Sequence, residues 1–264
     1  ICKHDHWCLL HKDRNAVICP RVSDGCTKDL GEAGYLHFLN KLPPGKRYTL
    51  PRFEPRVPAK AIDAPPPDWI TIIDGYRKAM TEQALQIASG ILGVSEDSLV
   101  RLGIGLAGPS AWSFPMSDYA SEPVGIRIRK SDGKKWAFKG SRNGLFIPTG
   151  INGKDPLIIC EGPTDTAAAL DLGFEAIGRP NCNGAVEWCI DFARGRTVAI
   201  FADNDGPGLD GANKLAEWLV RQGQHCKVLV SPYHKDLREW KRDGLMPSGL
   251  NQLISTAAWW RPVE

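Results

Sequence analysis

Short apolar runs alternate with amphipathic stretches along the second half of the chain. The apolar runs are bounded by turn residues and predict buried strands at 157–160, 174–178, 197–202 and 227–230. Between them, apolar residues at helical spacing predict helices over 164–172, 186–192 and 210–222. Strands that alternate with helices in this way form a parallel sheet that is covered on both faces. The pattern therefore predicts an α/β fold for this half.

Turn and capping residues set the expected ends of these helices. Thr164 is expected to cap the first of them, which Gly173 would end. Gly206 and Gly208 are expected to turn the backbone sharply and to make room for a phosphate. The last of the three helices would then start after Asp210.

Two further segments precede this half. Residues 41–68 are rich in proline, which disfavours a helix and predicts an extended linker. A helical pattern follows from residue 69 to 106, with Gly90 and Gly93 as expected breaks.

Length and composition indicate a cytoplasmic protein of several parts. The 264 residues, of which 42% are hydrophobic, suffice for one sizeable core and a small module. No apolar stretch approaches the roughly 20 residues that span a bilayer, so we expect no membrane partner. No secretory signal opens the chain, and its first residue is Ile1, which suggests a piece of a longer protein.

Charge is distributed unevenly. Residues 41–150 carry 16 basic and 10 acidic side chains, whereas residues 151–264 carry 12 basic and 15 acidic ones. Apolar and basic residues alternate over 124–129, and Asp132-Gly133 signals a turn, which together predict a hairpin. The cations of this segment are Arg127, Arg129, Lys130, Lys134, Lys135, Lys139 and Arg142.

Two aromatic residues, Trp136 and Phe138, lie among these cations. Cations attract a phosphate backbone and aromatic rings stack on unpaired bases, so the segment is a candidate surface for single-stranded nucleic acid. The alternative is a solvated hairpin whose aromatic residues belong to the core.

Acidic residues follow two of the predicted strands. Glu161 and Asp165 come after the first strand, and Asp203 and Asp205 come after the third. The carboxyl ends of parallel strands meet at one edge of a sheet, where open α/β folds place their chemistry. Crowded carboxylates repel one another unless a cation neutralises them, and oxygen ligands suit Mg²⁺ or Mn²⁺. Residues two apart in extended chain point the same way, so Asp203 and Asp205 could address one ion.

Cysteine and histidine residues gather at the beginning of the chain. In a cytosolic chain such a cluster predicts a zinc site before a disulfide framework. The expected ligands are Cys8, His11, Cys19 and Cys26, and either Cys2 or His4 could replace one of them. A segment this short and polar needs a metal to fold.

These motifs resemble those of DnaG-type primases over nearly the whole chain. A strand that ends in Glu161-Gly162, with Asp165 four residues after the Glu, and a strand that ends in Asp203-Asn204-Asp205 resemble the Toprim domain. Lys235-Asp236 resembles the third acidic position of that domain. Residues 1–40 resemble the zinc ribbon of these primases, with a longer loop between its second pair of ligands.

The resemblance implies four parts, of the kind found in plasmid or phage primases. A zinc ribbon would cover residues 1–40, the linker 41–68, a mixed α+β basic subdomain 69–150 and the Toprim domain 151–264. It also implies a helix over Tyr35–Leu39.

The resemblance assigns roles to the acidic residues. Glu161, Asp203 and Asp205 would be catalytic and would hold two Mg²⁺ ions, with Asp165 and Asp236 as further ligands. These ions would bridge nucleotide phosphates and lower the pKa of the attacking 3′-hydroxyl. Glu161 could instead act as a general base.

The basic residues and the partners follow from the same resemblance. Arg127, Arg129, Lys139 and Arg142 would contact template and nucleotide phosphates. The expected function is synthesis of short RNA primers on single-stranded DNA from nucleoside triphosphates during replication, with Mg²⁺ and Zn²⁺ as cofactors and a replicative helicase as partner.

Three other functions share some of these features. A Toprim topoisomerase needs a tyrosine on a further large domain. A Toprim nuclease uses the same acids but has no evident use for the zinc ribbon and basic subdomain. A recombination mediator joins zinc to Toprim without catalysis, and lacks the basic insert.

Overall fold

The computed structural model describes residues 9–10, 16–19, 21–30, 34–39 and 67–262. The chain divides into two units, residues 1–64 and residues 65–264, and each is described by itself.

The first unit contains an antiparallel sheet with strand order β1-β2-β4-β3. Its strands are β1 (Leu9–Leu10), β2 (Ala16–Cys19), β3 (Lys28–Asp29) and β4 (Tyr35–Phe38). The helix expected over Tyr35–Leu39 is therefore wrong. Tyr and Phe favour strands, and the segment pairs on both sides, with β2 and with β3, which satisfies its backbone groups.

The second unit begins with three helices, α1 (Trp69–Lys78), α2 (Glu82–Leu92) and α3 (Glu96–Arg101). Gly93 ends α2 in the left-handed conformation, as expected of a helix stop, whereas Gly90 lies inside the helix. The helical pattern that reaches Leu106 overshoots, because the chain turns at Gly103 (φ +68°) and enters a strand.

An antiparallel sheet follows, with strand order β5-β6-β7-β8. Its strands are β5 (Gly105–Gly108), β6 (Ala111–Ser117), β7 (Pro123–Lys130) and β8 (Lys135–Ala137). The hairpin expected around Asp132-Gly133 is the β7–β8 connection. Helix α1 packs Trp69 and Ile73 against Ile126 and Ile128 of β7.

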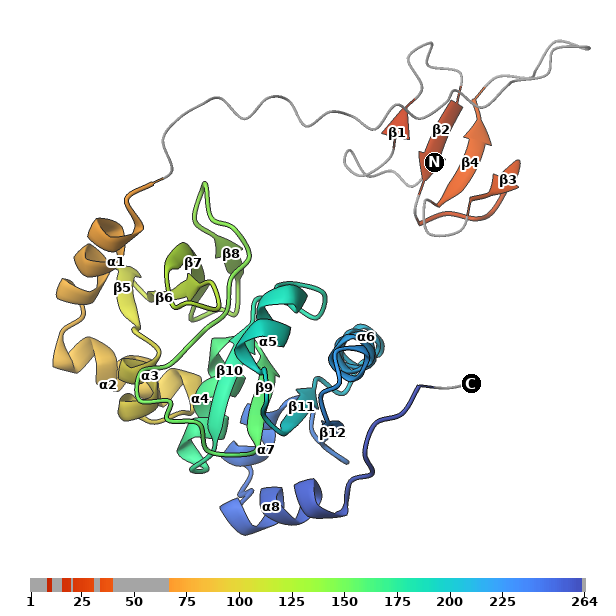
Figure 1. The fold of residues 1–264 in the computed structure, drawn as a ribbon. Coiled ribbons are helices and arrows are strands. Elements are labelled where there is room, and N and C mark those ends of the chain that lie inside the picture. The colour runs from red at the N-terminus through yellow and green to blue at the C-terminus, as the bar shows by residue number, and fades with distance from the viewer. Residues whose placement is uncertain (1–8, 11–15, 20, 31–33, 40–66, 263–264) are drawn as a thin grey trace, which may run out of the picture. The chain divides into compact units, whose positions relative to one another are not determined.

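A parallel sheet with strand order β10-β9-β11-β12 forms the rest of the unit (Figure 1). The strands are β9 (Leu157–Glu161), β10 (Glu175–Arg179), β11 (Val198–Ala202) and β12 (Cys226–Val230). The helices are α4 (Pro163–Asp171), α5 (Val186–Phe192), α6 (Gly206–Arg221), α7 (Leu237–Arg242) and α8 (Pro247–Thr256).

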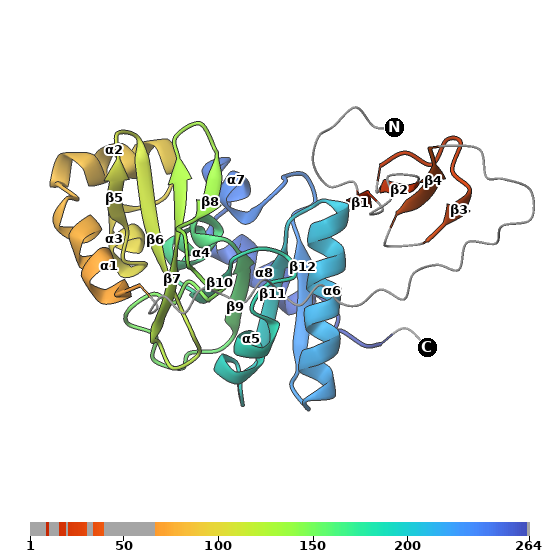
Figure 2. The same ribbon diagram turned by 90° about the horizontal axis from the view of Figure 1, so that it is seen from above.

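Alternate residues of these strands enter two cores. Ile158 and Cys160 of β9 belong to one core, with residues of α4, α7 and α8. Leu157 and Ile159 of the same strand belong to the other core, with residues of α5 and α6. Both faces of the sheet are thus covered, which confirms the predicted α/β class. Figure 2 shows the antiparallel sheet beside this parallel sheet.

Two helix starts differ from the expectation. Helix α4 is preceded by Gly162 at its N-cap and begins at Pro163, so Thr164 lies within its first turn. Helix α6 begins at Gly206 and not after Asp210, because the Asp205 side chain accepts a hydrogen bond from the Gly208 N–H and caps the helix. The two glycines are therefore in the first helical turn.

One buried carboxylate joins the helices of this unit. Asp171, at the end of α4, accepts hydrogen bonds from Ser95 Oγ (2.5 Å) and Ser98 Oγ (2.6 Å) of the α3 start. It also pairs with Lys241 Nζ of α7 at 2.6 Å. No helix in the described part of the chain is both long and apolar enough to cross a membrane.

Replacing Asp171 with Ala should destabilise the chain by about 2–4 kcal/mol, because it removes the anionic partner of Lys241 and the acceptor of the buried Ser98 hydroxyl. Urea unfolding followed by circular dichroism measures this loss. Replacing Glu217, which forms an exposed pair with Arg221 on α6, is the control and should cost less than about 1 kcal/mol. Equal losses in the two variants would contradict the role given to Asp171.

Candidate metal centre and basic surface

Acidic residues meet at the carboxyl edge of the parallel sheet. Glu161 is the last residue of β9, and Asp203 and Asp205 directly follow β11. Asp236 follows β12 after a short loop. Because all four strands run in the same direction, these carboxylates lie at one edge.

Backbone hydrogen bonds fix the two acidic loops to each other. The Asn204 N–H donates to the Lys235 carbonyl oxygen at 2.6 Å, which joins the loop after β11 to the loop after β12. The Asn204 side chain turns toward β12 and donates to the Ser231 carbonyl oxygen at 3.1 Å. Asp203 and Asp205, on either side of Asn204, are thereby left for the edge of the sheet.

Two of the acids also cap helices. Asp205 Oδ1 accepts from the Gly208 N–H at 2.9 Å, and Asp236 Oδ1 accepts from the Glu239 N–H at 2.7 Å. Gly208 has to be a glycine here, because a Cβ atom at this position would lie 2.5 Å from the Asp203 carbonyl oxygen. Each cap uses one carboxylate oxygen, and the second oxygen faces a cation: Asp205 Oδ2 lies 3.6 Å from Lys235 Nζ, and Asp236 Oδ2 lies 3.8 Å from Arg238 NH2.

Asp165 approaches the same cluster from the first turn of α4. Its side chain is buried, and its Oδ1 accepts a hydrogen bond from the Arg238 N–H at 3.0 Å. This bond ties the first turn of α4 to the first turn of α7.

Burial and mutual repulsion raise the pKa values of two carboxyl groups in this cluster. Burial raises the pKa of Asp165 to about 8, and the charges of Asp236 and Asp203 add to this effect. Burial also raises the pKa of Asp203 to about 7, with contributions from Glu161, Asp236 and Asp205. The five carboxylates are therefore close enough to repel one another, as the sequence predicts.

A hard divalent cation suits the oxygen donors of this edge, since it would relieve their repulsion. Within the described residues, however, no three His, Cys, Asp or Glu side chains are gathered closely enough to hold one ion. Glu161, Asp203, Asp205 and Asp236 all retain some solvent exposure and could rotate toward an ion, whereas Asp165 is buried.

The basic strands of the antiparallel sheet face these carboxylates. Arg129 of β7 and Lys135 of β8 are opposite each other in the pairing register. Partial burial and Arg129 lower the pKa of Lys135, while Asp165, Asp203 and Glu161 counteract this. Burial and Arg238 lower the pKa of Arg129, with Asp165 and Asp236 acting in the opposite sense. Both side chains thus lie within electrostatic reach of the acids.

The other three cations predicted to contact nucleic acid differ in their surroundings. Arg127 is half-buried and donates to the Pro180 carbonyl oxygen at 3.2 Å. The Arg142 guanidinium lies over the ring of Trp188, 5.8 Å from its centroid. Lys139 is exposed. Two of the three therefore contact the segment between β10 and the end of α5.

Three cations at the acidic edge were not predicted as site residues. They are Lys135, Lys235 and Arg238. Lys135 belongs to the basic run of the sequence. A hairpin with its turn at Asp132-Gly133 could have placed it opposite Arg129, on the same face of the sheet. Arg238 has no signal in the sequence, because only the docking of α7 on α4 brings it to the cluster.

The predicted zinc ligands are only partly within the described residues. Cys19 is buried on β2 and Cys26 is half-buried, and both are free thiols. Cys8 and His11 lie outside the described residues, so the zinc site stays a prediction.

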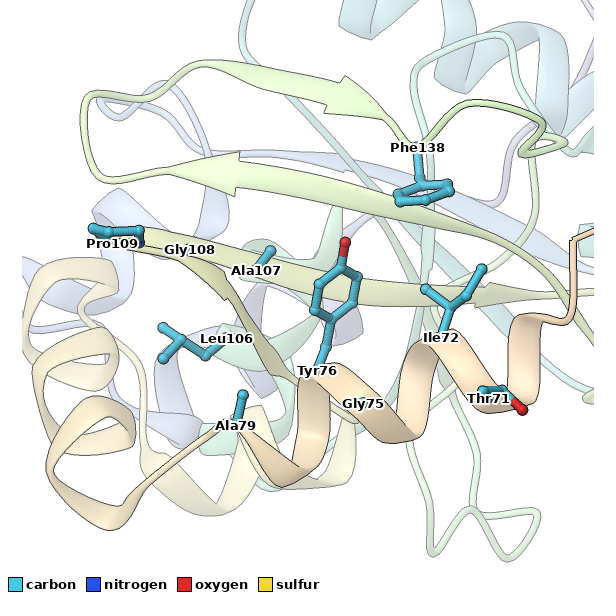
Figure 3. Close-up of a pocket in the computed structure, with 10 residues that line it drawn as sticks. All are labelled: Thr71, Ile72, Gly75, Tyr76, Ala79, Leu106, Ala107, Gly108, Pro109 and Phe138. Atoms are coloured by element: carbon cyan, nitrogen blue, oxygen red, sulfur yellow. The ribbon is translucent and has the colours of Figure 1, made fainter.

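An apolar groove lies between α1 and the antiparallel sheet, with a volume of about 710 Å³. Figure 3 shows Ile72 and Tyr76 rising from α1 toward the sheet, and Phe138 pointing toward them from beyond β8. No charged side chain lines this groove, so it is separate from the acidic edge.

The fold is that of solved DnaG-type primase cores. The ssDNA-bound DnaG primase catalytic domain matches with TM-score 0.59 and 15% identity, over 72% of this chain and 78% of that chain. The Aquifex aeolicus primase, with zinc-binding and RNA polymerase domains, matches with TM-score 0.60 and 13% identity, over 73% and 60%. The primase fragment of the bacteriophage T7 primase-helicase matches with TM-score 0.50 and 19% identity, over 63% and 71%.

At these identities the likeness establishes a shared fold. No protein-family model matches the chain, and no curated protein matches it by sequence.

Replacing Asp165 with Asn should stabilise the metal-free protein above pH 8. The folded pKa of Asp165 lies above its ordinary value of 3.8, so stability is highest at low pH and falls as pH rises toward about 8. Asn carries no charge but keeps an oxygen that accepts from the Arg238 N–H. Melting temperatures at pH 6 and pH 9 in the presence of EDTA measure the effect.

The melting temperature of the wild type should drop more between these two pH values than that of Asp165→Asn. Asp132→Asn, in the exposed β7–β8 turn, is the matched control and should follow the wild type. A parallel decline of Asp165→Asn and wild type would show that Asp165 is already ionised at pH 6.

Proposed function

We propose that this chain is a DNA primase that makes short RNA primers on single-stranded DNA by metal-dependent nucleotidyl transfer. The observation that carries the proposal is the meeting of two charged surfaces. Carboxylates from β9, α4, β11 and α7 gather at one edge of the parallel sheet, and cations of β7 and β8 lie within electrostatic reach of them. Phosphoryl transfer needs this combination, because it depends on positioning and on charge stabilisation.

Glu161, Asp203 and Asp205 are the proposed catalytic residues and metal ligands. Mg²⁺ or Mn²⁺ held there would supply charge for the attacking 3′-hydroxyl and the leaving pyrophosphate. Asp165 and Asp236 are proposed to complete the carboxylate set. The backbone bond between Asn204 and Lys235 keeps the two acidic loops at a fixed separation, which a transfer reaction requires.

Arg129 and Lys135 are the proposed contacts for nucleotide or template phosphates. They belong to paired strands and are close to the acids, so a phosphate between them and the acidic edge would meet positive charge from both sides. Lys139 is a further proposed contact. Arg127 and Arg142 are proposed to hold the segment after β10 in place as well as to attract phosphate.

The proposed partners are single-stranded DNA, nucleoside triphosphates and a replicative helicase. One structure with this fold holds single-stranded DNA, and another is part of a primase-helicase. The zinc ribbon of residues 1–40, with Cys8, His11, Cys19 and Cys26 as ligands, is proposed to orient the template.

Replacing Asp203 and Asp205 together with Ala should lower primer synthesis by on the order of 10³-fold or more, because the site loses two of the carboxylates that are proposed to hold the metal ion. The assay incubates the full chain with single-stranded DNA, ribonucleotides and Mg²⁺ and scores labelled products on a gel. Binding of the template should change little, since the removed groups are anionic. The control Glu217→Ala should retain full synthesis.

The same gel separates the proposal from the nuclease alternative. Shortened template without new primers would identify a nuclease, and undiminished synthesis by the double variant would overturn the assignment of the catalytic acids.

Neutralising Arg129 and Lys135 with Gln should weaken binding to single-stranded DNA and flatten its dependence on salt. Each lost phosphate contact should reduce the slope of log K against log salt by about 0.7. Fluorescence anisotropy at several salt concentrations gives this slope. Lys214→Gln, an exposed cation on α6, should leave it unchanged. An unchanged slope in the double variant would place the DNA elsewhere on the molecule.

A further inference from the structure

The loop between β12 and α7 presents one aromatic ring to solvent. Tyr233 is 89% exposed, more than any other large apolar or aromatic side chain of the described residues. Within this part of the chain, its ring forms no aromatic or cation–π contact. An aromatic ring gains free energy when another flat surface removes it from water, so this ring has an interaction left to make.

Hydrogen bonds fix the backbone on both sides of Tyr233. Ser231 is buried, and its Oγ accepts from the N–H groups of Tyr233 (3.4 Å) and His234 (3.0 Å). The side chain of Asn204, in the acidic loop after β11, donates to the Ser231 carbonyl oxygen at 3.1 Å. The Asn204 N–H donates to the Lys235 carbonyl oxygen at 2.6 Å. The ring is therefore carried by a segment that is already ordered, which lowers the entropic cost of binding a ligand there.

The residue after Tyr233 anchors the same loop to α7. The imidazole ring of His234 stacks on the indole ring of Trp240, with 14° between the ring planes and 6.2 Å between the centroids. Its Nε2 atom lies 3.1 Å from Asp243 Oδ2. Of the two neighbouring rings in this loop, one thus packs on a helix and the other is left for a ligand.

Tyr233 lies close to the acidic edge. Lys235 is two residues further on, and its Nζ is 3.6 Å from Asp205 Oδ2. Two residues of chain span at most about 7 Å. Asp236, at the end of the same loop, belongs to the proposed carboxylate set. A nucleotide whose phosphates lie at this edge is long enough to place its base on the ring.

The basic hairpin does not supply an aromatic ring to this edge. Lys135 lies within electrostatic reach of the acids, and the next residue, Trp136, points to the other face of the sheet. The partner of Trp136 in the pairing register is Ile128, which packs against α1. Phe138 lies edge-on to Trp69 of α1, with 6.1 Å between the ring centroids. A base at the acidic edge therefore needs a ring from another element.

We infer that Tyr233 is a stacking platform for a nucleobase whose phosphate lies at the acidic edge. The ligand is the flat face of the base, which every nucleotide offers, so the contact holds the substrate without selecting among bases. The base belongs either to a nucleoside triphosphate or to the single-stranded template. The inference rests on the proposed function and adds a base contact to the phosphate contacts given there.

The fluorescence of 2-aminopurine, which falls when this base stacks, reports the contact. Two probes separate the two sources of a base: 2-aminopurine riboside triphosphate without DNA, and a short oligothymidylate with 2-aminopurine at its centre, without nucleotide. Each probe is titrated with the full chain in the presence of Mg²⁺. The wild type should quench at least one of them. Tyr233→Ala should abolish most of this quenching and raise the Kd of that probe about tenfold.

Two further variants separate stacking from other effects. Tyr233→Phe keeps the ring and should behave like the wild type. Tyr119→Ala is the matched control, because Tyr119 is 52% exposed in the turn between β6 and β7, at the opposite end of β7 from Arg129. It should leave the binding of both probes unchanged. Circular dichroism melting should give nearly the same melting temperature for every variant, since side chains this exposed contribute little to stability.

Unchanged quenching and Kd in Tyr233→Ala would overturn the inference, as would a wild type that quenches neither probe. Loss of binding in Tyr233→Phe would also overturn it, because the hydroxyl group would then be the contact. Binding is measured without synthesis, so it is separate from the proposed function. A chain that quenches a probe through Tyr233 but makes no primers would disprove the primase assignment alone. A chain that makes primers and binds both probes equally well without this ring would disprove only the stacking role.

Discussion

The repulsion between carboxylates at one edge of the parallel sheet is the constraint on which the rest of the site depends. Five acids from β9, α4, β11 and α7 lie close enough for burial and mutual charge to raise the pKa values of Asp165 and Asp203 toward neutrality. Such an arrangement is costly for a fold that needs no cation there. Its persistence is explained if the cluster works with positive charge, supplied partly by the protein and partly by a metal ion.

Helix α4 connects the acidic edge to the neighbouring helices. It starts directly after the strand that carries Glu161, and each of its two ends holds a carboxylate that binds α7. Asp165 accepts from the backbone of Arg238, and Asp171 pairs with Lys241. Asp171 also accepts hydrogen bonds from the hydroxyl groups of Ser95 and Ser98 at the start of α3. The acidic edge and the preceding helical segment are thus locked together by the same helix.

The antiparallel sheet adds charge of the opposite sign. Register places Arg129 opposite Lys135, and both are within electrostatic reach of the acids, while Arg127 and Arg142 contact the segment that follows β10. The cations of the basic run therefore divide into a pair near the acidic edge and a pair that joins the two sheets. This division explains how one basic hairpin could both attract phosphate and support the framework of the site.

The sequence by itself determined the parallel sheet, the alternation of its strands with α4, α5 and α6, and the position of Glu161, Asp203 and Asp205 at the carboxyl edge of the sheet. These follow from local periodicity and from the rule that parallel strands end at one edge. The helix predicted over Tyr35–Leu39 is the strand β4, because this segment pairs with β2 and β3. Helix α6 starts earlier than predicted, because the Asp205 side chain caps it. Only the tertiary structure decided the place of Arg238, since the docking of α7 on α4, and no periodic signal, brings it to the acids.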